Sequence, residues 1–130
     1  MAHNIAWDNQ GKTVVLQQHL PPSNKEDLLQ LAEKSAELLK SVAHTVHLII
    51  DERSVRLMLS TTDLQNLERF VPPNQGTVVV VVAKKDVPYK MLTQNHGKVT
   101  APKSVNRTYF AASIEEAREI LQRQVSVQYP

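Results

Sequence analysis

The side chains that could act as acid, base or nucleophile in a catalytic site are Asp51, Glu52, Ser54 and His96. Nucleophilic catalysis needs a base held against the nucleophile, and nothing in the spacing of these residues brings such a pair together. Phosphate-binding loops and dinucleotide fingerprints need clustered glycines, whereas the three glycines of this chain are widely separated. We therefore expect a protein that is not an enzyme and has no cofactor.

Metal-ligating residues are also poorly placed. The chain has no cysteine, which excludes disulfides and thiolate sites and fits a reducing compartment. His44 and His47 lie three residues apart at the approach to a predicted strand, so their side chains project to opposite faces. We expect no metal site.

The length and the hydropathy of the chain indicate its class. The 130 residues suit a single domain, 1–130. The first residues lack the charged and apolar regions of a signal peptide. No apolar run approaches the roughly 20 residues that span a membrane. The sequence therefore predicts a soluble, cytoplasmic protein without a membrane span.

The basic residues are unevenly distributed. Residues 84–107 contain six Lys or Arg and a single Asp, whereas the rest of the chain has nine basic and twelve acidic residues. Such a segment can attract an anionic partner, for which Lys84, Lys85 and Lys90 are the candidates, or it can be a solvated loop. Aromatic residues make up only 5% of the chain and form no stacking series in this segment, so we expect no specific nucleic-acid binding.

Five consecutive valines within residues 77–83 indicate the architecture that must position these side chains. A run without alternation predicts a strand buried on both faces, which is typical of a parallel sheet covered by helices on both sides. The other predicted strands are residues 5–7, 13–20, 46–51 and 108–111. The predicted helices are residues 24–43, 62–71, 88–97 and 114–124, and residues 125–130 are left as a loose tail. This order predicts an α/β fold with a central mixed, largely parallel sheet of about five strands, about four flanking helices and an N-terminal antiparallel hairpin.

Capping signals mark the starts of these helices. Ser23 and Ser113 are each followed three residues later by a glutamate, the spacing in which a hydroxyl and a carboxylate satisfy free backbone N–H groups. Thr62 has the same spacing to a glutamine. We expect both serines to lie just outside their helices.

Several short strings resemble the STAS superfamily, in particular its branch of sporulation anti-sigma-factor antagonists, which is sometimes grouped with the lipid-carrying CRAL-TRIO fold. The strings are the apolar strand that ends in Asp51, the helix start at residues 60–64, the valine strand, and the strand, cap and helix of residues 109–117. Together they cover nearly the whole chain, although each motif is short. The resemblance implies a bacterial regulatory domain that binds a protein partner.

In classical antagonists of this family, a kinase partner phosphorylates a hydroxyl of an Asp-Ser-Ser/Thr-Gly motif at the start of the second helix. The resemblance places Ser60 and Thr61 on the two hydroxyl positions, whereas Leu59 and Thr62 depart from the motif's Asp and Gly. The free N–H groups and the dipole of a helix start favour a phosphate. Helix capping alone also accounts for these hydroxyls, so both interpretations stay open.

The first hypothesis on function is a non-enzymatic interaction module. It offers a protein partner the surface around residues 60–63 and 84–90, together with Asp51, Ser54 and Asp63. Both segments follow the carboxyl ends of adjacent predicted strands, so we expect them at one edge of the domain.

The second hypothesis is a carrier or sensor of a small apolar or anionic ligand. Lys84, Lys85 or Lys90 would lie at the mouth of its pocket. The side chains expected to line the pocket are Met58, Leu59, Tyr89, Met91 and Leu92. These apolar groups can equally fill the core. A homodimer is a further assembly that the sequence leaves open.

Overall fold

The computed structural model describes residues 3–20, 25–53, 61–86 and 108–129. These residues form one five-stranded sheet in the order β1-β2-β3-β4-β5. β1 (His3–Trp7) pairs antiparallel with β2 (Val14–His19). The sheet then continues in parallel through β3 (Val46–Asp51), β4 (Gln75–Val81) and β5 (Thr108–Ala111). The predicted α/β class, the mixed sheet and the N-terminal hairpin are confirmed.

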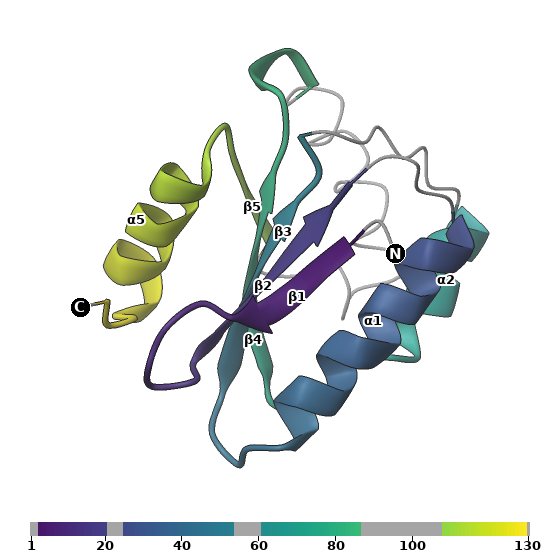
Figure 1. Ribbon diagram of the computed structural model, residues 1–130, viewed down its shortest axis with the longest axis horizontal. Helices are drawn as coiled ribbons and strands as arrows, with labels where there is room; N and C mark the ends of the chain where they lie inside the picture. Colours follow the sequence, from purple (N-terminus) through teal and green to yellow (C-terminus); the bar gives the residue numbers. More distant parts are fainter. Residues whose placement is uncertain (1–2, 21–24, 54–60, 87–107, 130) are drawn as a thin grey trace.

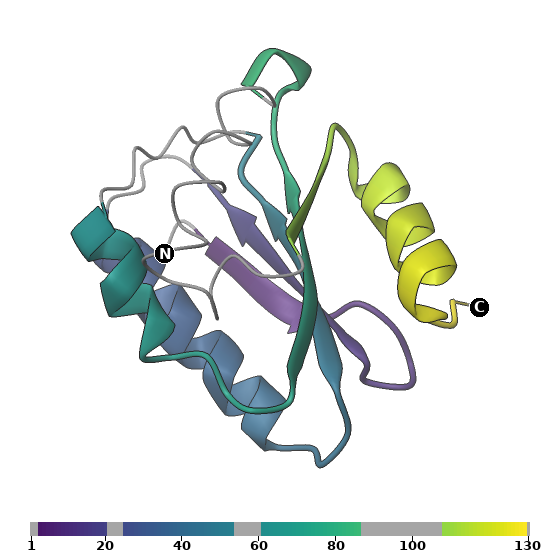
Figure 2. The ribbon, with the colours of Figure 1, turned by 180° about the vertical axis from the view of Figure 1, so that it is seen from behind.

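Helices lie on both faces of this sheet (Figures 1 and 2). α1 (Lys25–Lys40) and α2 (Thr61–Glu68) cover one face, α5 (Ile114–Val125) covers the other, and a short 3₁₀ helix, η1 (Lys84–Asp86), follows β4. The described residues thus contain three α-helices rather than the four expected, and the predicted helix 88–97 lies outside them. None of the helices in the described ranges has the length and apolarity needed to cross a bilayer.

The ends of the helices depend on side chains that cap them. Ser113 lies just outside α5, and its Oγ accepts a hydrogen bond from the Glu116 N–H at 3.0 Å, as predicted. Ser23 lies outside the described residues. α1 ends at Lys40, earlier than the predicted residue 43. The Asn74 amide donates to carbonyl oxygens near and beyond this end, and it lies 2.7 Å from that of Leu39.

The core is divided by the sheet into two clusters. On the α5 side, Val79 and Val81 of β4 pack with Ile49 of β3 and Leu121 of α5. On the α1 side, Val78 packs with other buried residues that include Val15, Leu39, Val46 and Leu48. Alternate valines of one strand therefore enter different clusters, which explains why the run has no polar face.

β4 is an interior strand, as predicted, but it differs from the expected strand in two ways. It begins at Gln75 rather than at residue 77, so Gly76 lies within the strand. Val80 is only half-buried, whereas Val79 is fully buried on the opposite face. The side of the sheet that carries α1 and α2 is thus less tightly covered at Val80.

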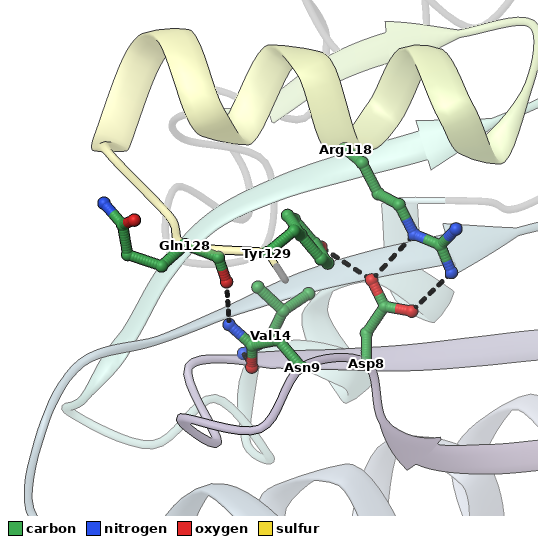
Figure 3. A network of polar contacts seen from close by, with 6 residues as sticks. All are labelled: Asp8, Asn9, Val14, Arg118, Gln128 and Tyr129. Atoms are coloured by element: carbon green, nitrogen blue, oxygen red, sulfur yellow. Dashed lines mark hydrogen bonds and ion pairs between the residues drawn. The ribbon is translucent and has the colours of Figure 1, made fainter.

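Residues 126–129, which follow α5, pack against the body of the protein. Val127 is 7% exposed and belongs to the core cluster on the α5 side. Figure 3 shows the polar contacts that hold the segment: the Tyr129 hydroxyl donates to Asp8 at 2.6 Å, and the Asn9 amide donates to the Gln128 carbonyl at 3.1 Å. These contacts come from the distant β1–β2 turn, so the local sequence of residues 126–129 does not indicate them.

Candidate functional site

Parallel strands end together at one edge of this sheet, and the sequence-predicted site residues follow those ends. Asp51 pairs with Val81 in register, and Val81 pairs with Ala111, so β3, β4 and β5 end at matched positions. The residues that end or follow these strands, together with the starts of α2 and α5, are called the carboxyl edge below. It is the place where open α/β sheets usually bind ligands and partners.

Asp51 and Arg53 form a fixed ion pair at the carboxyl edge. The Arg53 guanidinium donates from Nε to Asp51 Oδ1 at 3.0 Å and from Nη2 to Oδ2 at 2.9 Å. The Arg53 backbone N–H also donates to Oδ1, at 3.1 Å. A bidentate pair of this kind restricts both side chains, so the guanidinium is held in one orientation at the surface.

The environment of this pair favours its charged form. Burial on its own raises the pKa of Asp51, but hydrogen bonds from Arg53, the positive charge of Arg53 and a hydrogen bond from Gln18 outweigh burial, so the pKa lies below its usual range. The hydrogen bond to Asp51 is the largest cause of the raised pKa of Arg53. Both groups therefore stay ionised at neutral pH.

Lys84 and Lys85 lie on η1, which stands beyond the ends of β3 and β5 in both ribbon views (Figures 1 and 2). Both side chains are exposed. A hydrogen bond from the Asp86 N–H to the Ala83 carbonyl, at 2.8 Å, closes the turn that presents them. We call this pair the lysine tip. Its two ammonium groups are accessible to a partner from outside the sheet.

The start of α2 belongs to the same edge. α2 begins at Thr61, and Asp63 lies in its first turn, where a carboxylate complements the positive end of the helix dipole. Ser60, the other candidate phosphoacceptor, lies outside the described residues, as do Ser54 and Lys90. The residues proposed to line a carrier pocket, at 58, 59, 89, 91 and 92, lie outside them as well.

The described part of the carboxyl edge carries charges of both signs. Arg53 interacts electrostatically with the carboxylate of Glu115, which lies with Glu116 in the first turn of α5. Glu52 is buried beside Asp51, and its backbone N–H donates to the Val81 carbonyl at 2.8 Å. The described part of the edge is therefore a mixed surface with a projecting basic tip.

Sequence reasoning placed Asp51, Asp63, Lys84 and Lys85 correctly at the ends of their elements but overlooked Arg53. The sequence did contain a signal for the role of Arg53. Residues two apart in an extended segment project to the same side, so an Asp-x-Arg spacing at a strand end places the two charges together. Within the described ranges, no three His, Asp or Glu side chains are grouped so that they could hold a metal ion.

Comparison of the chain with protein-family models, with curated proteins and with solved structures gives no significant match.

Proposed function

We propose that this protein is a non-enzymatic interaction module that binds an acidic surface of a partner protein through its carboxyl edge. The observation that carries the proposal is the lysine tip: two adjacent exposed ammonium groups on a turn that stands beyond the sheet. Lysines so placed act at long range and steer an acidic partner toward the edge.

The mixed charges behind the tip favour a protein as partner. Asp51 neutralises Arg53 and fixes its orientation, and Glu115 contributes a further negative charge nearby. A surface of alternating signs matches another protein surface better than it matches the uniformly negative backbone of a nucleic acid. The resemblance to STAS anti-sigma-factor antagonists supports the same reading, since those domains act by binding other proteins.

Regulation of this contact by phosphorylation at Ser60 or Thr61 belongs to the same proposal. Thr61 is the first residue of α2, where backbone N–H groups lack partners within the helix. A phosphate there adds negative charge to the edge that carries the lysine tip. Phosphorylation is thus expected to weaken binding of an acidic partner. Helix capping by these hydroxyls stays the alternative.

The test compares two double charge reversals. Lys84→Glu with Lys85→Glu removes the lysine tip. Lys12→Glu with Lys40→Glu makes the same charge change at exposed residues of the β1–β2 turn and of the end of α1, two segments that lie far from η1 (Figure 1). Proteins cross-linked to each variant in cells that produce the native chain are quantified by mass spectrometry. We expect a partner that is retained by wild type and by the Lys12/Lys40 variant and lost by the Lys84/Lys85 variant. Equal retention by all three proteins contradicts the proposal.

A further inference from the structure

A cavity of about 110 Å³ lies between α1, α2 and the sheet, away from the carboxyl edge. Its floor is formed by side chains of β3 and β4, which include Leu48 and Val78. Leu67 of α2 and Phe70, which follows that helix, line its outer side and are half-buried. The two helices and the sheet therefore border a space that is partly open to solvent and that no described side chain fills.

The cavity exists because α1 presents small side chains to the sheet at this point. Ala32, Ser35 and Ala36 have the spacing of one helical face, and all three line the cavity. Larger apolar residues at both ends of α1, Leu28 and Leu39, are buried. These larger residues set the distance between α1 and the sheet, and the small side chains between them are too short to fill the space that results.

The lining restricts the chemistry of an occupant. None of the described residues that line the cavity carries a charge, and transfer of an ion into such a site costs far more than transfer of a neutral group. The wall is nevertheless not wholly apolar. Gln17 and Ser35, each 4% exposed, hydrogen-bond to one another across the gap between β2 and α1. An amide and a hydroxyl have more donor and acceptor capacity than this one bond uses.

We propose that this cavity binds a compact, uncharged and mainly apolar molecule that carries one hydrogen-bonding group, of about the size of phenol. The volume limits the occupant to a single ring at most, because it is below the roughly 150 Å³ of an enclosed apolar cavity that takes up benzene. This cavity is partly open to solvent, which leaves room for a hydroxyl on the ring. The apolar floor removes the ring from water, and the Gln17–Ser35 pair receives the polar group. This site is independent of the proposed partner surface, since it lies between the helices and not at the strand ends.

The experiment uses phenol and benzene as matched probes that differ by a single hydroxyl. Each is titrated into the full chain, and the methyl signals of Leu48 and Val78 are followed by NMR. We expect saturable shifts of these signals with both probes. Ser35→Ala is expected to lower the affinity for phenol roughly two- to tenfold, the effect of one hydrogen bond, and to leave the affinity for benzene unchanged.

A filled cavity provides the decisive variant. Ala32→Leu places a larger side chain in the space and is expected to abolish saturable shifts with both probes, whereas Ala43→Leu makes the same change at an exposed residue that does not line the cavity. If Ala32→Leu does not fold, Ala32→Val tests the same space with a smaller addition. Binding that persists in the folded filled variant, or the absence of saturable shifts in wild type, overturns the proposal. Neither result affects the partner test at Lys84 and Lys85.

Discussion

Asp8, in the turn between β1 and β2, and Arg118, on α5, form a bidentate ion pair across 110 residues of sequence. The Asp8 side chain is only 4% exposed, and it also accepts a hydrogen bond from Tyr129 (Figure 3). The Arg118 guanidinium lies 5.7 Å from the centre of the Tyr129 ring. One buried carboxylate thus joins the first hairpin, the last helix and the C-terminal residues.

Removal of this carboxylate is expected to destabilise the whole domain. Asp8→Ala leaves two donors without their common acceptor, and we expect the free energy of unfolding in urea to fall by about 2 kcal/mol. Tyr129→Phe is expected to cost about 1 kcal/mol, and the double variant less than the sum, because both changes remove the same hydrogen bond. Glu33→Ala, at an exposed carboxylate of α1, is the control and should change little. Strictly additive effects would show that the network does not act as a unit.

Tyr129 also predicts how stability changes at alkaline pH. Burial raises the pKa of its hydroxyl, and the hydrogen bond to Asp8 and the charge of Asp8 raise it further. In the unfolded chain this hydroxyl ionises near pH 10, whereas the folded protein keeps its proton to higher pH. Its contribution to stability is therefore complete below about pH 10 and is lost as the pH rises toward the folded pKa.

The measurement is the free energy of unfolding of wild type and of Tyr129→Phe at about pH 8 and about pH 11. These two values lie on either side of the pKa of a tyrosine in an unfolded chain. The difference between the two proteins should shrink at the higher pH, because only wild type loses a contribution there. Ionisation of other groups affects both proteins and cancels in the comparison. A difference that is the same at both pH values contradicts the assignment.

The sheet was predictable from the sequence because the pattern of apolar residues in a strand depends on which of its faces are buried. The valine run indicated an interior strand, and the parallel order then placed Asp51 and Lys84 at one edge. The packed C-terminal residues were not predictable in this way, since Val127 and Tyr129 show no periodicity of their own. Their order depends on Asp8 and Asn9, which are close only after the sheet and α5 have formed.

Gly76 shows the same limit within a strand. The valine run predicted a strand within residues 77–83, but β4 includes Gly76, where a Cβ would lie 2.5 Å from His47 Nδ1 and 2.8 Å from Thr45 Cγ2. The His47 ring lies there because its Nδ1 accepts a hydrogen bond from the Thr77 N–H at 2.9 Å, next to an irregularity in the β3–β4 register. A glycine is thus required at residue 76 because side chains of the neighbouring segment leave no room for a Cβ, and not because of its own backbone conformation.

We therefore expect Gly76→Ala to destabilise the protein by about 1–3 kcal/mol, the usual cost of overpacking. The cost should fall in a His47→Ala background, because the nearest obstructing side chain is then absent, although Thr45 remains. The free energies of unfolding of the two single variants and the double variant give the coupling. A Gly76→Ala cost that is unchanged when His47 is absent would mean that the ring is not the obstacle.

The two faces of β4 offer a matched comparison of burial. Val79 is 0% exposed, whereas its neighbour Val80 is half-buried on the opposite face. Val79→Asp places a carboxylate in a closed core and should cost several kcal/mol or prevent folding. Val80→Asp should cost less, since water can reach the carboxylate. The melting temperatures of both variants test this order, and a lower value for Val80→Asp would reverse the assignment of faces.

The ion pair of Asp51 with Arg53 predicts the response of the protein to acid. The folded pKa of Asp51 lies below the value of about 3.9 that an aspartate has in an unfolded chain. Between these two values the unfolded state binds more protons, so stability falls as the pH falls through this window, and the contribution is complete above it. Asp51→Asn removes the ionisable group, so the advantage of wild type over this variant should be larger at about pH 6 than at about pH 3. Urea unfolding at both pH values measures it, with Glu33→Gln as a control for the loss of an exposed carboxylate. An advantage of wild type that is as large at the lower pH would show that Asp51 stabilises the strand end through its shape and not through its charge.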